Sequence, residues 1–246
     1  VKISRKNIFN FYIKRIKRIL PALVFIILVC LILGFFLLST ESYERLSRSS
    51  IFSSLFLSNF FFWREWGYFD LTSLNKPLLH TWSLSVEMQF YFVFPIILLV
   101  LNNLFKKIDI FFKLFFLFII LILVTEIFVE SKKIATFYLM PFRLSEFLIG
   151  AIGYNFEKKY NNKIDNIYIF FLSLLLIVFC FYFFDKNINF PGLNSILPCF
   201  LAIVLILNKN NNLTNKILKN KLLIFLGNIS YSLYLVHWPI YVFYRF

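Results

Sequence analysis

Between Lys76 and Pro95 the chain carries the polar side chains that are least expected in so apolar a sequence. His80, Ser83, Glu87 and Tyr91 are spaced i, i+3, i+7 and i+11, which places them on one face of a helix. A carboxylate at the centre of a membrane helix costs about 2.5–3.5 kcal/mol on insertion scales, so such residues are functional candidates. Glu87 and His80 are therefore predicted catalytic residues, or else members of a polar stripe between helices, with His80 at the membrane interface.

A second pair of charges lies in another apolar run. Arg143 and Glu146 are spaced i, i+3, so they can form an ion pair on one helix face. They either line a substrate site or form a structural pair that lets both side chains enter the membrane. Gly150 and Gly153 follow them and are expected to allow close helix packing.

A third candidate site precedes the first long apolar run. Arg15 and Arg18 are also i, i+3 neighbours, and a guanidinium offers a bidentate fork to phosphate. The alternative is that they only anchor the helix end on the basic side of the membrane. Near the end of the chain, Ser230, Tyr234 and His237 share a helix face, which is either a functional site or part of an outer interfacial belt. Because Trp238, Tyr241 and Tyr244 also suit such a belt, we favour the belt.

The composition defines which elements must position these residues. The 246 residues are 60% hydrophobic and only 15% charged, whereas soluble domains are near 45–50% apolar and about 25% charged. A soluble globular enzyme and a disordered chain are both excluded. The net charge of +14 comes from basic residues between apolar runs, so we expect no nucleic-acid partner. Three scattered cysteines and two histidines predict no disulfide framework, no metal site and no bound cofactor.

Runs of about 20 apolar residues predict an all-α, polytopic integral-membrane helix bundle with about seven spanning helices. An eighth run, Ser49–Trp63, is shorter and contains Ser and Asn, so we expect a re-entrant or interfacial segment there. The seven candidate spans are Ile19–Leu38, Leu78–Leu101, Leu114–Val129, Ile134–Phe156, Ile167–Phe184, Phe190–Leu207 and Leu222–Tyr244.

Basic residues predict the orientation. Residues 1–18 contain many Lys and Arg and no acidic residue, which places this end in the cytoplasm. If Ser49–Trp63 does not span, the loops on that same side hold an excess of Lys and Arg; if it spans, the two sides balance. The expected bias therefore favours the non-spanning segment. This orientation puts Arg15 and Arg18 at the cytoplasmic mouth, and His80, Glu87, Arg143 and Glu146 toward the outer side.

Six blocks of sequence, which include the candidate residues above, resemble the acyltransferase-3 family, the bacterial integral-membrane O-acyltransferases of surface glycans. The resemblance covers nearly the whole chain, and the pairing of HTWSLSVE with SYSLYLVHWP is its most specific part. Two departures are Lys14, where the family usually has Arg, and Met88, which interrupts its usual Glu-Gln pair. The matching blocks are FYIKRIKRILPAL, WGYFD at Trp66–Asp70, PLLHTWSLSVEMQFYFVFP, FYLMPFRLSEFLIGA, FPGLNSILP and LGNISYSLYLVHWPI.

The resemblance implies an enzyme that transfers an acyl group, acetyl above all, from cytoplasmic acyl-CoA to a sugar hydroxyl of a cell-surface or lipid-linked polysaccharide such as lipopolysaccharide. It implies a multi-pass protein of the bacterial inner membrane, with residues 1–246 forming one acyltransferase domain. The implied roles are acyl-CoA binding for Arg15 and Arg18, support of catalysis for Glu87 and His80, and structure or substrate lining for Arg143 and Glu146.

The same resemblance predicts an interior piece of a longer protein, incomplete at both ends. The family's catalytic histidine is expected on a helix before Val1, so this piece alone is expected to be inactive. Two other classes stay open: a transporter or flippase of glycan precursors without chemistry, because buried charges and re-entrant segments suit transport too, and a non-enzymatic scaffold or relic.

Overall fold

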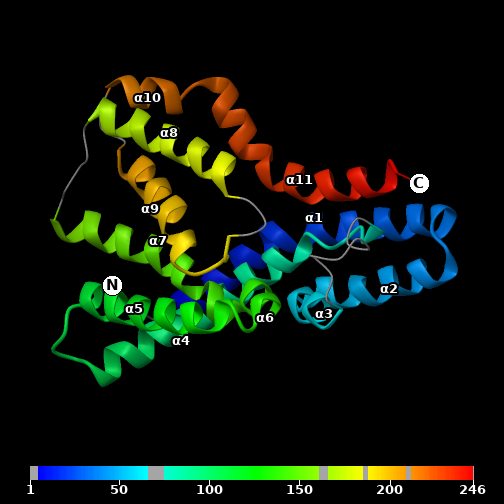
Figure 1. The fold of residues 1–246 in the computed structure, drawn as a ribbon, viewed down its shortest axis with the longest axis horizontal. Coiled ribbons are helices and arrows are strands. Elements are labelled where there is room, and N and C mark those ends of the chain that lie inside the picture. Colours follow the sequence, from blue (N-terminus) through cyan, green and yellow to red (C-terminus); the bar gives the residue numbers. More distant parts are fainter. Residues whose placement is uncertain (1–4, 66–74, 161–165, 185–187, 209–211, 246) are drawn as a thin grey trace. The chain divides into compact units, whose positions relative to one another are not determined.

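The computed structural model describes the whole chain except residues 1–4, 66–74, 161–165, 185–187, 209–211 and 246. The described residues form helices joined by turns and loops and include no strand, which confirms the predicted all-α class. The helices are α1 (Arg5–Leu37), α2 (Thr40–Ser54), α3 (Ser58–Arg64), α4 (Thr81–Leu104), α5 (Ile110–Val129), α6 (Lys133–Tyr138), α7 (Met140–Tyr160), α8 (Ile167–Phe183), α9 (Leu193–Leu207), α10 (Asn212–Leu218) and α11 (Lys221–Phe243) (Figure 1).

Among the described residues, four helices are long and apolar enough to cross a membrane. They are the Ile8–Leu37 part of α1, together with α4, α5 and α11. The apolar helices α8 and α9 have 17 and 15 residues, which at 1.5 Å per residue is shorter than a bilayer core of about 30 Å. The multi-pass character is therefore confirmed, but the number of about seven spans is not.

The expected single span Ile134–Phe156 is wrong, because the helix breaks at Leu139 between α6 and α7. Pro141 favours the break, since proline has no N–H to donate to a carbonyl one turn earlier and is best accommodated in the first turn of a helix. α7 accordingly begins at Met140, and Arg143 and Glu146 follow in its first two turns.

The expected re-entrant run Ser49–Trp63 is not one helix either. It comprises the end of α2 and most of α3, separated by a turn in which Phe56 has a φ of 56°, in the left-handed region. Neither α2 nor α3 is long enough to span a bilayer alone, at 15 and 7 residues.

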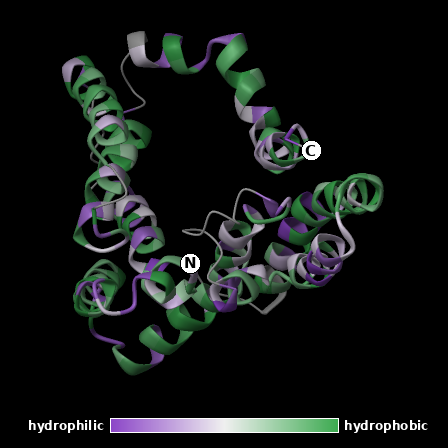
Figure 2. Ribbon diagram, turned by 45° about the vertical axis from the view of Figure 1, so that its right-hand side comes forward, coloured by the Kyte–Doolittle hydropathy of each residue, from purple (hydrophilic) through white to green (hydrophobic). Residues whose placement is uncertain are grey.

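The chain forms two compact units, which are described separately. The first contains residues 1–100, 138–140 and 228–246, and the second contains residues 101–137 and 141–227. In both, the long helices are mostly hydrophobic, whereas the short helix α2 of the first unit is mostly polar (Figure 2). Many large apolar side chains are exposed, for example Phe116, Ile127 and Phe181, as expected of helices whose solvent is lipid.

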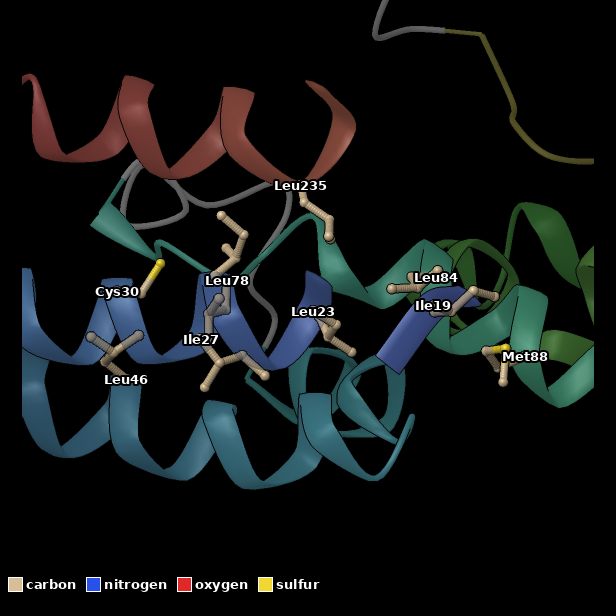
Figure 3. Close-up of a cluster of buried hydrophobic side chains, with 10 residues drawn as sticks. Ile19, Leu23, Ile27, Cys30, Leu46, Leu78, Leu84, Met88 and Leu235 are labelled. Carbon is tan, nitrogen blue, oxygen red and sulfur yellow. The ribbon is translucent and has the colours of Figure 1, made fainter. Parts of the chain in front are cut away.

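The core of the first unit forms where α1 packs against α2, α4 and α11 (Figure 3). α1 contributes residues three or four apart, which form one stripe of an α-helix. Gly34 lies so close to α2 that an added Cβ would meet Leu46 at 2.6 Å. The core side chains are Ile19, Leu23, Ile26, Ile27, Cys30, Leu46, Leu78, Leu84, Met88 and Leu235.

Candidate functional site: an arginine and carboxylate cavity

A cavity of about 420 Å³ lies beside this core in the first unit. Three helices line it: α1 brings two arginines, α4 brings a serine and a glutamate, and α11 brings a serine and two tyrosines. The cavity thus places cations, a carboxylate and hydroxyl groups around one space. Its lining residues are Arg15, Arg18, Ile19, Ser83, Leu84, Glu87, Ser230, Tyr231 and Tyr234.

The arginines are positioned by the helical spacing of α1 and by aromatic rings. The guanidinium carbon of Arg15 lies 4.5 Å from the ring centroid of Tyr91 and 5.5 Å from that of Phe11. Such cation–π contacts hold a guanidinium in place while its N–H groups remain donors. Arg15 is half-buried and Arg18 is exposed, so both can reach a ligand that enters the cavity.

Glu87 is connected to Arg15 through Tyr91. The Tyr91 hydroxyl donates to Glu87 Oε1 at 2.5 Å, and the ring of the same tyrosine lies beneath Arg15. The residue that holds the Glu87 carboxylate is therefore Tyr91, one turn later on the same helix α4, in the spacing predicted from the sequence. Tyr91 thus contacts the Glu87 carboxylate through its hydroxyl and the Arg15 guanidinium through its ring.

The hydroxyl groups of the cavity form a second connected set. The Tyr234 hydroxyl donates to the carbonyl of His80 and lies 2.6 Å from the Ser83 hydroxyl. The Tyr231 hydroxyl donates to the carbonyl of Ile19 at 2.8 Å. These bonds tie α11 to α1 and to the start of α4, so they position two phenols and a serine around the cavity.

His80 lies just before α4 and is buried, and its side chain does not line the cavity. Its ring centroid is 5.4 Å from that of Tyr234 and 5.6 Å from that of His237. Neither ring nitrogen of His80 makes a hydrogen bond of normal geometry within the described residues, although the backbone of Pro77 and Leu235 lies near the ring. The structure thus places His80 outside the cavity lining, where its carbonyl accepts the hydrogen bond of the cavity-lining Tyr234.

The structure also corrects the predicted separation of the site residues. The sequence placed Arg15 and Arg18 at one mouth of the bundle and Glu87 toward the other, but all three line one cavity. The helix α1 explains the difference: it starts at Arg5, well before the apolar run, so the arginines lie within a helix that packs along α4.

Ser230 and Tyr234 were wrongly interpreted as belt residues, since both line the cavity. His237, the third residue of that set, is exposed. The i, i+4 spacing of Ser230 and Tyr234 was a usable signal, because two hydroxyls on the same face of a core-facing helix need a polar partner.

The start of α4 is held in place by a ladder of hydroxyl groups from the α2–α3 segment. Ser53 lies 2.9 Å from Thr81, Thr81 donates to Ser58 at 3.0 Å, and Ser58 lies 2.7 Å from Ser85. All four side chains are buried. The serines that made Ser49–Trp63 a poor span are therefore the groups that fix the cavity-lining helix.

Gln89 extends this ladder by one turn. Its side-chain amide donates to Asn59 Oδ1 at 2.7 Å and to the carbonyl of Phe56 at 3.0 Å, while Asn59 donates to the carbonyl of Tyr138. Gln89 thus stabilises the left-handed turn at Phe56. The residue before it, Met88, packs in the hydrophobic core. Met88 and Gln89, which follow Glu87 in the chain, therefore both have a structural role.

Arg143 and Glu146 lie in the second unit and line no part of this cavity. They form the predicted ion pair, at 3.2 Å between Arg143 Nη2 and Glu146 Oε2, and both side chains are 15% exposed. The guanidinium of Arg143 also lies over the rings of Phe137 and Phe190. Nearby, Glu126 accepts from the backbone N–H of Leu193 at 2.9 Å, so this unit contains a separate polar cluster around the Phe190–Gly192 segment.

Within the described residues, no group of three or more His, Cys, Asp or Glu side chains could hold a metal ion. The WGYFD block at Trp66–Asp70 lies outside the described residues. The chemistry that the cavity offers is therefore that of cations, hydroxyl donors and one carboxylate. Such a set suits a ligand that carries phosphates and a polarised carbonyl group.

Fold and cavity together define a multi-pass membrane protein in which three helices enclose a cavity lined by arginines, a glutamate and hydroxyl groups. The chain belongs to the acyltransferase domain family, whose sequence profile matches residues 2–246. An uncharacterized protein of Haemophilus influenzae is 33% identical over 218 residues, a match that covers 83% of this chain and 88% of that protein.

The O-acetyltransferase OatA of Staphylococcus aureus is 30% identical over 253 residues. That match covers 96% of this chain but 41% of OatA, so the chain spans less than half the length of this relative. No solved structure matches the chain.

Proposed function

We propose that this protein is a membrane O-acyltransferase that moves an acyl group, acetyl by preference, from cytoplasmic acyl-CoA to a sugar hydroxyl of a surface or lipid-linked polysaccharide. The observation that carries the proposal is the single cavity in which Arg15 and Arg18 face Glu87 and the hydroxyls of Ser83 and Tyr234. Membership of the acyltransferase domain family and the likeness to an O-acetyltransferase support the reaction class.

In this proposal the arginines bind the donor. CoA carries phosphates, and a guanidinium binds phosphate oxygens through two parallel N–H donors. Arg15 is already oriented by Tyr91, so less side-chain entropy is lost when it binds. Arg18 is exposed at the cavity and completes a two-point contact.

The reaction itself is a displacement at the thioester carbonyl. The sugar oxygen forms a bond to the carbonyl carbon, a tetrahedral oxyanion follows, and the carbon–sulfur bond breaks. The sugar hydroxyl loses its proton to a base, and the CoA thiolate leaves and is protonated. We assign the hydroxyls of Tyr234 and Ser83 to the oxyanion, since both line the cavity. The Tyr234 hydroxyl has one proton, which it donates to the His80 carbonyl in the resting site, so it exchanges this bond for one to the oxyanion during the reaction.

Glu87 keeps a supporting role in this scheme. Its carboxylate holds Tyr91, and Tyr91 in turn supports the guanidinium of Arg15. His80 supports the oxyanion donors in a similar way, because its carbonyl accepts from Tyr234. We propose that both residues position catalytic groups, while Arg143 and Glu146 stabilise the second unit or line a substrate path there.

The test is incorporation of labelled acetyl groups from acetyl-CoA into glycan by membranes that contain the protein expressed from its complete gene. Label in the glycan, lost in Glu87→Gln at unchanged protein abundance, supports the transferase. The matched control is Glu44→Gln, an exposed glutamate of α2 that lines neither this cavity nor the core. Altered glycan export without any label in the glycan would contradict the proposal and favour a transporter.

We further propose that the protein lies in the bacterial inner membrane with residues 1–18 in the cytoplasm, where acyl-CoA is found. Lys14 and Glu44 are both exposed, and the proposed topology puts them on opposite sides. After removal of the native cysteines, an impermeant thiol reagent should label Glu44→Cys in intact cells and Lys14→Cys only after permeabilisation. The reverse pattern would invert the orientation and remove Arg15 and Arg18 from the donor side.

A further inference from the structure

A second cavity, of about 190 Å³, lies in the first unit and shares no lining residue with the arginine and carboxylate cavity. Helices α2 and α3 and the segment Asn75–Pro77 enclose it, and we call it the α2–α3 cavity. It contains two carboxylates, two cations, an amide, two serine hydroxyls and two aromatic rings. Its lining residues are Glu41, Ser42, Arg45, Leu46, Ser49, Phe61, Phe62, Glu65, Asn75, Lys76 and Pro77.

The charged groups of this cavity are paired. Lys76 Nζ lies 3.1 Å from Glu65 Oε2, and these side chains are only 12% and 27% exposed. At the rim, Arg45 Nη2 lies 2.7 Å from Glu41 Oε1. Two negative and two positive groups leave no net charge, so the cavity gives no electrostatic preference to a phosphate or to another polyanion.

The arrangement fits a ring that carries hydroxyl groups. Each sugar hydroxyl both donates and accepts, so it can bond a carboxylate and an ammonium or amide side by side, and bonds to charged partners are the stronger ones. Phe61 is half-buried beside the buried Phe62, and together they form an apolar wall against which the C–H face of a sugar can pack. A volume of 190 Å³ suits one such ring rather than a chain of them.

We propose that the α2–α3 cavity is the acceptor subsite, which binds one uncharged sugar ring of the glycan. This inference rests on the proposed function, because it names where the acceptor of that reaction binds. Glu65, Lys76 and Asn75 bind ring hydroxyls, Phe61 packs on the ring face, and Glu41 and Arg45 close the rim.

The chain connects this subsite to the cavity of the reaction. One short segment lines the α2–α3 cavity at Asn75–Pro77 and the first cavity at Ser83. α11 touches both ends of it, since Trp238 Nε1 donates to the carbonyl of Lys76 at 2.8 Å and Tyr234 donates to the carbonyl of His80. The segment that lines the α2–α3 cavity is therefore fixed to the same helix, α11, that carries Tyr234 of the first cavity.

The experiment compares variants with a matched pair on one helix. Glu41 and Glu44 both lie on α2 and both pair with an arginine four residues later, but only Glu41 lines the cavity. Glu41→Gln and Glu65→Gln test the subsite, and Glu44→Gln is the control. Binding of methyl glycosides of glucose and N-acetylglucosamine to the detergent-purified protein is measured by saturation-transfer NMR, without acyl donor and with inorganic phosphate as the comparison probe.

We expect one of the glycosides to bind, Glu65→Gln to weaken it about tenfold, Glu41→Gln to weaken it less, and Glu44→Gln to leave it unchanged. Glycoside binding that is unaffected in Glu65→Gln, equal loss in Glu44→Gln, or saturation by phosphate instead of sugar would each overturn the subsite. A variant that fails to fold is recognised by loss of the cooperative thermal transition of the detergent-purified protein.

Transfer assays separate this proposal from the proposed function. If the protein acylates glycan, Glu65→Gln should raise KM for the acceptor about tenfold and leave KM for acetyl-CoA unchanged. If no transfer occurs but the glycoside binding still depends on Glu65, the proposed function fails and the sugar site stands. If transfer occurs with an unchanged acceptor KM, the reaction stands and the subsite fails.

Discussion

Replacement of Arg15 and Arg18 tests whether they bind a donor or only anchor α1. The matched controls are Lys14 and Lys17, which lie on the same helix, carry the same charge, are exposed and do not line the cavity. We compare Arg15→Ala and Arg18→Ala with Lys14→Ala and Lys17→Ala, and we add Arg18→Lys, which keeps the charge but loses the fork. Every alanine variant removes one positive charge, so a general electrostatic effect of the basic helix cancels in the comparison.

The expected loss of acetyl-CoA affinity follows from the contacts that each arginine makes. A hydrogen bond to a charged group is worth roughly 1.5–3 kcal/mol, or about 10–150-fold in affinity. Arg15 also lies 4.5 Å from the Tyr91 ring, a contact worth about 0.5–2 kcal/mol, which pre-orients the guanidinium. We expect Arg15→Ala and Arg18→Ala to weaken acetyl-CoA binding at least tenfold, Arg18→Lys to weaken it by less, and the two lysine variants to change it less than twofold.

The assay is isothermal titration of acetyl-CoA into the detergent-purified protein, at two salt concentrations, with abundance in the membrane measured in parallel. Wild-type affinity in both Arg15→Ala and Arg18→Ala would refute the donor site and leave the arginines as topology anchors. Equal weakening in Lys17→Ala would also refute it, because the effect would then belong to the net charge of the helix and would fall with added salt.

Three further outcomes follow from the structure. Tyr234→Phe, which removes one oxyanion donor, should lower acyl transfer about 10²-fold while acetyl-CoA affinity stays within twofold; loss of affinity instead would reassign Tyr234 to binding. Asn59→Leu removes a buried amide, leaves the half-buried Gln89 amide with one of its two acceptors and leaves the Tyr138 carbonyl without its Asn59 donor, so it should lower thermal stability in detergent by roughly 1–3 kcal/mol; an unchanged melting temperature would show that the ladder does not hold α3. Gly153→Ala should destabilise the protein because its Cβ would meet Ile203 at 2.8 Å, while Gly150→Ala, an exposed helix position with nothing within 4 Å, should stabilise it by up to about 1 kcal/mol; equal effects would contradict the α7–α9 contact.

The two glycines illustrate what a sequence pattern can and cannot give. Both Gly150 and Gly153 were expected to allow close packing, and the spacing of small residues on α7 supports this equally for each. In the structure only Gly153 faces a neighbour, whereas Gly150 has open space around it. Helical periodicity defines faces, but which face meets a partner depends on segments far away in the chain.

The candidate site shows the same division. The face of α4 that carries Ser83, Glu87 and Tyr91 and the i, i+3 pair Arg15 and Arg18 could be predicted, because each belongs to a single helix. The sequence could not predict that these two faces enclose one cavity together with Tyr234 of α11. Helices so far apart in the chain give no local signal of which of them pack together. The apolar run also predicted a first span that begins at Ile19, after Arg15 and Arg18. The helix α1 begins at Arg5, because charged side chains can form part of a helix that extends beyond its apolar stretch.

The segment between α1 and α4 explains why the departures from a simple span pattern matter for function. Its serines and asparagine weaken it as a membrane span, and the same groups form the buried ladder that holds the start of α4. Because α4 carries Ser83 and Glu87, any shift of α3 moves the hydroxyl and the carboxylate relative to Arg15 on α1. A displacement of about 1 Å in such a site costs about 10²-fold in rate, which is comparable to the loss of an oxyanion donor. Polar residues that are unsuited to a membrane span therefore have two uses here: some line the cavity that is proposed to bind the substrate, and others hold the cavity-lining helix in place.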